Sequence, residues 1–165
     1  MLALVLAACS GGGSLQQVTP IAVDAGRAAS LVSAYRAQNG LGPVGVDSTL
    51  MQAASAHARL MGERDTMSHS LGGALPRRMR AAGYDWGAAA ENLGAGYASL
   101  GAAVEGWKTS PDHRRNLLNP NVTEVGIAAV GTPAGSKYRT YWALILAAPR
   151  PPPDMAGPYA MGSLR

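Results

Sequence analysis

Three side chains capable of acid–base or metal chemistry fall close together in the middle of the chain. They are His69 in Met-Ser-His-Ser, Glu91 in Ala-Glu-Asn-Leu, and His113 in Ser-Pro-Asp-His-Arg. Two imidazoles and a carboxylate, with a water molecule, can complete a tetrahedral zinc shell. The same groups could act without a metal, because a histidine beside a carboxylate can serve as a general base. They could also form a hydrogen-bonded network that only shapes a cleft.

No side chain near these groups has the sequence context of an activated nucleophile. Ser68, Ser70 and Ser110 lack the strand–turn–helix pattern of a nucleophile elbow. The remaining histidine, His57, falls on the apolar face of a predicted helix. We therefore expect His57 to be a buried histidine with satisfied hydrogen bonds rather than a catalytic one. Metal or ligand binding, hydrolysis and a structural network all remain open at this stage.

The segments that must position these groups are mostly short helices. Helical periodicity and capping residues predict helices over 24–38, 47–61, 76–82 and 99–109, followed by a short helical turn from Ser110-Pro111. His69 lies in a polar, Gly-rich loop over 63–74. Glu91 lies in an apolar stretch, 88–97, to which we assign no element. Because an isolated buried charge is costly, we expect Glu91 to have a partner.

Two strands are predicted near the end of the chain. Residues 124–130 and 138–147 are rich in apolar and β-branched side chains, and Thr-Pro-Ala-Gly separates them, so they should pair as antiparallel neighbours. The continuous apolar run 141–148 indicates a central strand covered on both faces. Helices first and strands last favour an α+β fold over a parallel alternating one.

The composition sets broad limits on function. A chain of 165 residues suits one domain with its own core. The net charge is +4, but the basic residues are scattered and are not interleaved with aromatics, so we expect no nucleic-acid partner. Cys9 is the one cysteine, which rules out a disulfide within the chain.

The N-terminal segment 1–9 is predicted to be a lipoprotein signal segment. Its apolar run is too short to span a bilayer, and Leu-Ala-Ala-Cys resembles the lipobox in which a cysteine such as Cys9 is lipidated. No Lys or Arg precedes the run, which leaves Met1 uncertain as the natural start. We expect a flexible linker over 10–22, a folded domain over 23–148, and a Pro-rich disordered tail over 149–165.

The order of the motifs resembles the CAP superfamily, which comprises cysteine-rich secretory proteins, antigen 5 and plant pathogenesis-related class 1 proteins. The similarity is greater to its bacterial secreted branch, and it covers roughly residues 25–148. The resemblance implies a three-layer α-β-α sandwich, with a small antiparallel sheet between helices and an open central cleft. The pieces that carry it are His57-Ala58, Ser68-His69-Ser70, Arg80-Ala81-Ala82-Gly83-Tyr84, Ala90-Glu91-Asn92-Leu93, Trp107, Ser110-Pro111, His113-Arg114, Asn116-Leu117-Leu118-Asn119 and Thr123-Glu124-Val125-Gly126.

In that family two histidines and two acidic residues meet in the cleft. The matching positions here are His69, Glu91 and His113. The second acid is a departure, because Ser110 stands where many eukaryotic members have Glu. Glu105 and Glu124 are the nearest acids in sequence. We expect Glu105 to face away from the Trp107 side of its helix and Glu124 to hold the start of its strand.

The resemblance implies a secreted bacterial protein, and the lipobox-like sequence at Cys9 adds a membrane tether in the cell envelope. We expect a monomer attached to the membrane through Cys9, whose cleft binds a divalent cation such as Zn²⁺, a small molecule, or a lipid, sterol or cell-wall ligand without catalysis. The expected metal ligands are His69, Glu91 and His113. One alternative is a metal-assisted or His/Glu-based, peptidase-like hydrolase with the same three residues catalytic. Another is an envelope protein-interaction module whose cleft network is purely structural.

Overall fold

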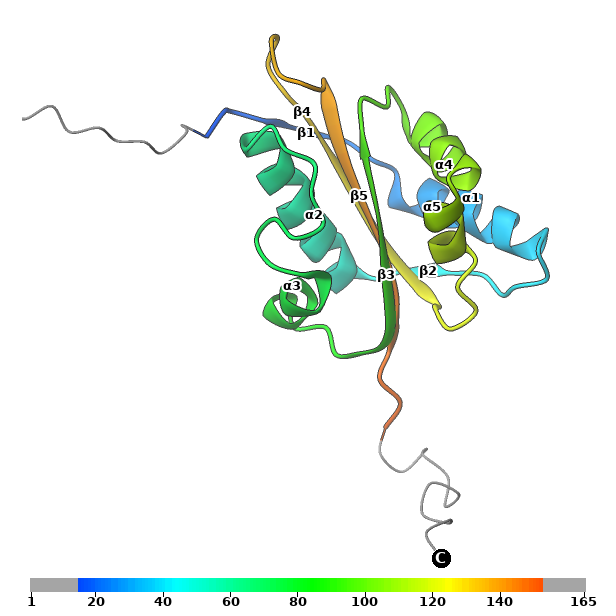
Figure 1. The fold of residues 1–165 in the computed structure, drawn as a ribbon. Helices are drawn as coiled ribbons and strands as arrows, with labels where there is room; N and C mark the ends of the chain where they lie inside the picture. Colours follow the sequence, from blue (N-terminus) through cyan, green and yellow to red (C-terminus); the bar gives the residue numbers. More distant parts are fainter. Residues whose placement is uncertain (1–14, 153–165) are drawn as a thin grey trace, which may run out of the picture.

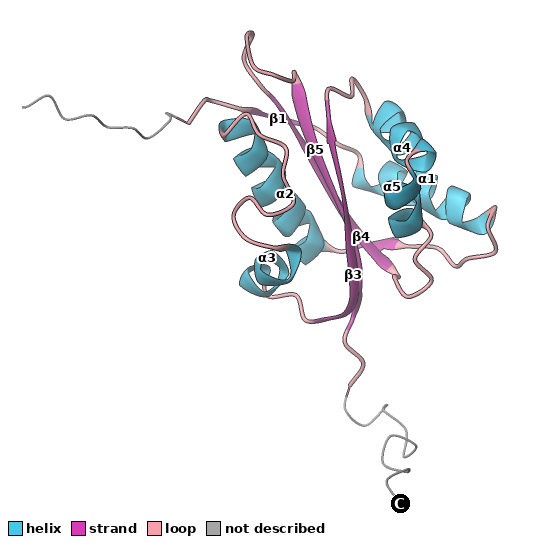
Figure 2. Ribbon diagram, viewed as in Figure 1, coloured by secondary structure: helices cyan, strands magenta, loops and turns pink. Residues whose placement is uncertain are grey.

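The computed structural model describes residues 15–152, which form a sandwich of two helical layers around one sheet (Figures 1 and 2). Helices α2 (Ser48–Glu63) and α3 (Leu75–Ala82) cover one face of the sheet. Helices α1 (Ala25–Ala37), α4 (Leu100–Thr109) and α5 (Pro111–Leu117) cover the other. The predicted α+β class and α-β-α layering are confirmed. None of the helices in residues 15–152 is long and apolar enough to cross a membrane.

The sheet has five strands and is mainly antiparallel. The strands are β1 (Thr19–Ile21), β2 (Gly45–Val46), β3 (Trp86–Ala95), β4 (Glu124–Gly131) and β5 (Thr140–Pro149). Their order is β1-β4-β5-β3, and the short β2 pairs in parallel with β4. The predicted antiparallel pairing of the last two strands is confirmed.

Strand β5 is apolar along its length because each face packs against a different helical layer. Its odd-numbered side chains, from Tyr141 to Ala147, belong to the cluster formed with α2 and α3. The even-numbered Trp142, Leu144 and Leu146 belong to the cluster formed with α1 and α4. Successive side chains of a strand point to opposite faces, so a strand between two covered faces needs no polar position.

Strand β3 was not predicted from the sequence. The segment is Trp-Gly-Ala-Ala-Ala-Glu-Asn-Leu-Gly-Ala, which contains no β-branched residue, so its intrinsic strand preference is low. It is a strand because it pairs with β5 from Trp86 to Ala95, where both faces can be buried. Tertiary pairing therefore overrides local propensity here.

The folded domain extends beyond both predicted boundaries. The linker was predicted to run to residue 22, but 19–21 form β1 against β4, and the Gln16 amide donates to the Glu63 carbonyl at 3.0 Å. At the other end, Pro149 completes β5 and the Arg150 amide donates to the Asp85 carbonyl at 3.1 Å. The predicted lipidation site Cys9 and the tail beyond 152 lie outside the described residues.

The helix starts follow the predicted capping residues. Asp24 accepts a hydrogen bond from the Arg27 amide at 2.9 Å, and Asp47 accepts one from the Leu50 amide at 2.8 Å. A capping carboxylate satisfies a backbone donor that the helix cannot pair internally. The second helix ends at Glu63 rather than at residue 61.

The Arg36 side chain links α1 to the segment that follows α5 through hydrogen bonds. The sequence did not predict this role. The side chain is 1% exposed. Its guanidinium donates at 2.8–3.0 Å to four carbonyl oxygens, those of Gly42, Leu117, Asn119 and Val122. The burial is tolerated because these carbonyls replace water as hydrogen-bond partners.

Helix α2 lies unusually close to the sheet at Gly126 on β4. A Cβ atom at this position would lie 2.2 Å from the Leu50 carbonyl carbon and 2.4 Å from its oxygen. Both are backbone atoms, which cannot rotate away as the end of a side chain can. The Gly of the Thr-Glu-Val-Gly motif therefore sets the spacing between α2 and the sheet.

We predict that Gly126→Ala destabilises the protein by about 3 kcal/mol or more, because α2 must move off the sheet. Gly131→Ala on the same strand is the matched control, since the nearest atom to its new Cβ lies 3.7 Å away. That control should change stability by less than about 1 kcal/mol. Urea unfolding of both variants tests the prediction, and equal stabilities would contradict it.

Candidate functional site

The site is centred on Glu91, which lies on an edge strand. Strand β3 pairs only with β5 in the described sheet, so its other edge is open to side chains from the helical layers. Glu91 lies opposite Ile145, so its side chain points to the face covered by α2 and α3. The residue is 6% exposed. The expected burial of Glu91 is confirmed.

Arg78 of α3 is the partner that the buried carboxylate requires. Its Nη2 atom donates to Glu91 Oε1 at 2.8 Å and to Oε2 at 3.0 Å. The same guanidinium donates to the carbonyl oxygens of Gly73 and His69, at 2.9 and 3.2 Å. Arg78 therefore compensates the charge of Glu91 and also holds the loop that carries His69. The sequence analysis did not identify Arg78 as the partner of Glu91. The one sequence feature that pointed to it was the pair of basic residues near the start of α3.

His69 is oriented by Glu91. Its Nδ1 atom lies 2.8 Å from Glu91 Oε2, and its side chain is 62% exposed. An ionised carboxylate can only accept a hydrogen bond, so this contact places a proton on Nδ1. In the neutral ring Nε2 then carries a free lone pair. The structure thus presents Nε2 as an available acceptor at the exposed side of the site.

His113 reaches the same region from the opposite helical layer. Burial first, and then the nearby His69, lower the pKa of His113, while Asp112 opposes the shift. The His113 carbonyl accepts from Asn92 Nδ2 at 3.0 Å, which fixes α5 against β3. Within residues 15–152 no hydrogen bond joins its ring to Glu91 or His69.

The neighbouring acids do not complete the site. Glu124 accepts a hydrogen bond from the Tyr84 hydroxyl. Glu105 pairs with Lys108 at 2.6 Å and has a side chain 67% exposed. Both acids are engaged elsewhere, and Ser110, at the start of α5, has no side-chain capping hydrogen bond.

The donor set does not fit a metal ion bound by all three predicted ligands. Both oxygens of Glu91 are engaged by Arg78, and one also by His69. In the part of the chain that the structure describes, no group of three or more His, Cys, Asp or Glu side chains is arranged to hold a metal ion. Glu91 instead occupies the position of an acceptor that orients a histidine. Metal binding by the two imidazoles stays a prediction.

His57 lies beneath this cluster on α2. It is 1% exposed, and its Nε2 atom lies 3.9 Å from Glu91 Oε1. Its predicted burial is confirmed. Neither ring nitrogen makes a hydrogen bond of full geometry to the described residues, but the Ser68 backbone lies close enough to raise the pKa of the ring, so the predicted satisfaction of its hydrogen bonds stays a prediction. Burial lowers the pKa of His57 to about 4, against the opposing influence of Glu91.

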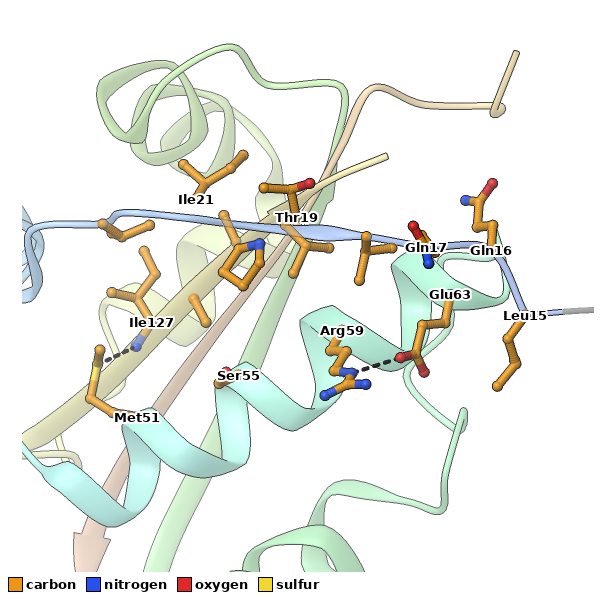
Figure 3. Close-up of a pocket in the computed structure, with 16 residues that line it drawn as sticks. Leu15, Gln16, Gln17, Thr19, Ile21, Met51, Ser55, Arg59, Glu63 and Ile127 are labelled. Carbon is orange, nitrogen blue, oxygen red and sulfur yellow. Dashed lines mark hydrogen bonds and ion pairs between the residues drawn. The ribbon is translucent and has the colours of Figure 1, made fainter. Parts of the chain in front are cut away.

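A separate groove of about 780 Å³ lies between β1 and α2 (Figure 3). Ile127 and Met51 lie at one end, where the Ile127 amide donates to the Met51 sulfur at 3.1 Å. Arg59 and Glu63 form an ion pair along its α2 side. None of the three predicted site residues lines this groove, so we do not assign the cleft chemistry to it.

Sequence comparison identifies the family. The model of the CAP, or cysteine-rich secretory protein, family matches residues 29–146. The chain therefore belongs to the CAP family, and the predicted resemblance is confirmed.

Among its relatives are two Bacillus subtilis proteins, both described as uncharacterized. YkwD is 32% identical over 102 residues, and the membrane protein YlbC is 33% identical over 99 residues. These alignments cover 61% and 59% of this chain, but only 40% and 29% of the relatives. The chain therefore corresponds to less than half the length of either protein.

Solved structures confirm the fold. An extracellular SCP-domain protein from Bacillus anthracis matches with a TM-score of 0.65 and 25% identity, over 74% of this chain and 39% of that one. An outer surface protein from Borrelia burgdorferi matches with a TM-score of 0.66 and 23% identity, over 80% of this chain and all of that one.

We predict that Glu91→Ala destabilises the protein by about 3–5 kcal/mol, because it leaves the mostly buried Arg78 guanidinium without a counter-charge. Glu105→Ala removes an acid from an exposed ion pair and should cost less than about 1 kcal/mol. Denaturant unfolding near neutral pH compares the two. A Glu91→Ala protein as stable as Glu105→Ala would show that the Arg78–Glu91 pair contributes no net stability.

Stability should also fall in mild acid because of His57. Its folded-state pKa lies below 6.5, so the unfolded chain takes up the proton first. The stabilisation that neutral His57 gives the folded state is complete above about pH 6.5. It is lost as the pH falls towards about 4. Between about pH 7 and about pH 4.5 the resulting loss in the free energy of unfolding is about 2 kcal/mol.

His57→Leu should remove that part of the pH dependence. His113→Ala is the comparison variant. The lowered pKa of His113 also makes the protein less stable in acid, so its effect on the pH dependence of stability has the same sign. Unfolding titrations across this range measure both effects. An unchanged pH slope in His57→Leu would contradict the assignment.

Proposed function

We propose that this CAP-domain protein is a non-enzymatic binding protein of the bacterial cell envelope, and that its cleft binds a ligand through His69 and His113. One observation carries the proposal. Glu91 is neutralised by Arg78 and hydrogen-bonded to His69 Nδ1, which leaves His69 Nε2 as the accessible acceptor. The chemistry of the cleft then belongs to the imidazoles rather than to the carboxylate.

A divalent cation such as Zn²⁺ is the ligand class that suits two neutral imidazoles. His69 would bind through Nε2 with Glu91 fixing its ring, and His113 would supply the second nitrogen. Two protein donors leave further coordination positions to water or to another ligand, so the site would be weaker than a closed structural zinc site. A bound cation would act as a Lewis acid toward a small ligand that enters the cleft.

Attachment to the membrane through Cys9 belongs to the same proposal. Its support is the Leu-Ala-Ala-Cys sequence followed by a Gly- and Ser-rich stretch. The names of similar proteins agree with an envelope or extracellular location, since they describe an extracellular protein, an outer surface protein and a membrane protein.

Hydrolysis is the second candidate, favoured by the Glu91–His69 contact. A histidine oriented by a carboxylate has the arrangement of a general base. The adjacent hydroxyls of Ser68 and Ser70 lie 3.1 Å from each other. Among the described residues neither bonds to the His69 ring, so any nucleophile would be water.

We predict that calorimetric titration of the full chain with Zn²⁺ near neutral pH shows binding that His69→Ala and His113→Ala each abolish. Glu91→Gln keeps the shape of the side chain but weakens the orienting acceptor, and should lower affinity by about 10–100-fold. Glu105→Ala, an exposed acid outside the cleft, should bind as the wild type does.

Zinc binding that survives both histidine substitutions would place the metal elsewhere. No binding by the wild type would remove the cation from the proposal. Peptide hydrolysis by the wild type that both histidine variants lose would establish the hydrolase instead.

A further inference from the structure

Three of the four large apolar side chains that are well exposed in residues 15–152 lie at one end of the molecule. Leu15 begins the described chain, Met67 follows α2, and Tyr138 lies in the β4–β5 hairpin; they are between 42% and 52% exposed. The fourth, Val46, lies on β2, which pairs with the opposite end of β4. Exposed apolar side chains that gather on one surface mark an interaction site, whereas scattered ones do not.

Hydrogen bonds hold the three segments of this end together. The Gln16 amide donates to the Glu63 carbonyl at 3.0 Å, and its side-chain oxygen accepts from the Ser136 hydroxyl at 2.9 Å. The Asp65 carboxylate accepts from the Lys137 amide at 2.8 Å. The start of the described chain, the C-terminal end of α2 and the β4–β5 hairpin therefore form one ordered surface (Figure 1).

The exposed charges of this surface are mainly positive. Arg64, Lys137 and Arg139 are exposed, and none of the ion pairs in residues 15–152 involves them. The neighbouring acids are already engaged, because Glu63 is in an ion pair within α2 and Asp65 is bonded to the hairpin backbone. The three cations are thus available to an anionic partner. We call this surface the hairpin end, and it comprises Leu15, Arg64, Met67, Lys137, Tyr138 and Arg139.

An anionic lipid bilayer matches both properties of the hairpin end. Each Lys or Arg close to such a surface strengthens binding by about fivefold. Tyr and aliphatic side chains are stable in the headgroup region, where one side is apolar and the other is wet.

The position of the N-terminal segment favours a bilayer over other anionic partners. Leu15 follows Cys9 by six residues, which span at most about 21 Å. A tether at Cys9 would therefore hold the hairpin end towards the membrane. The described chain ends after β5 at the opposite end of the molecule (Figure 1).

We propose that the hairpin end docks directly on the surface of an anionic lipid bilayer. Its three apolar side chains enter the headgroup region, and its three cations contact lipid phosphates. The choice of partner rests on the proposed attachment at Cys9, but the contacts themselves need no lipid on that residue.

The test is cosedimentation of full-length Cys9→Ser protein, which cannot be lipidated, with phosphatidylcholine vesicles that contain about 30 mol% phosphatidylglycerol. Binding should weaken as salt is added, and should be at least about tenfold tighter than binding to pure phosphatidylcholine vesicles. In this background Met67→Ser should weaken binding by at least about fivefold. Val46→Ser is the matched control, because that apolar side chain is equally exposed at the other end of β4, and it should bind as the parent does.

Lys137→Glu should weaken binding by at least about tenfold. Arg77→Glu makes the same change in charge at an exposed position of α3, away from the hairpin end (Figure 1), and should cost less than about threefold. If Lys137→Glu fails to fold, Arg139→Glu replaces it.

Three results would overturn the proposal: no binding to the anionic vesicles, equal binding to the neutral ones, or Met67→Ser and Lys137→Glu each binding as tightly as its control. Zinc titration of Lys137→Glu should match the wild type. Since the Cys9→Ser protein carries no lipid, the docking surface, the tether and the cleft can fail independently.

Discussion

A buried carboxylate on an edge strand is the constraint on which much of this structure depends. Glu91 is 6% exposed, and a charge in that position persists only when it is paired and hydrogen-bonded. Arg78 supplies the pair, and its bonds to the carbonyls of Gly73 and His69 order the loop between α2 and α3. One electrostatic requirement thus fixes a helix, a loop and the first imidazole together.

The backbone of the same strand imposes a second requirement. In the sheet of residues 15–152, strand β3 has an open edge, and its outward carbonyls need donors that no neighbouring strand there provides. Asn116 of α5 donates to the Glu91 carbonyl at 3.0 Å, and the Trp107 indole of α4 donates to the Leu93 carbonyl at 2.8 Å. These motif residues cover the edge, and they also bring the segment that carries His113 alongside β3.

In the proposed function, the chemistry of the site belongs to the histidines rather than to the carboxylate. An internal guanidinium already supplies the positive charge that a metal ion would otherwise provide to Glu91. His69 is the exposed member of this cluster, with a side chain 62% exposed. Arg78 also lines, with His57, a small pocket between α2 and α3.

The sequence by itself determined the helices, the β4–β5 pair and the motifs that identify the CAP family. Periodicity and capping are local signals, so they survive without tertiary information. Only the tertiary structure decided that 86–95 form a strand, that Arg78 pairs with Glu91, and that His57 is buried beside Glu91. The reason is physical. A strand poor in β-branched residues is stabilised by its neighbour in the sheet, and the partner of a buried charge comes from a distant element that no local pattern specifies.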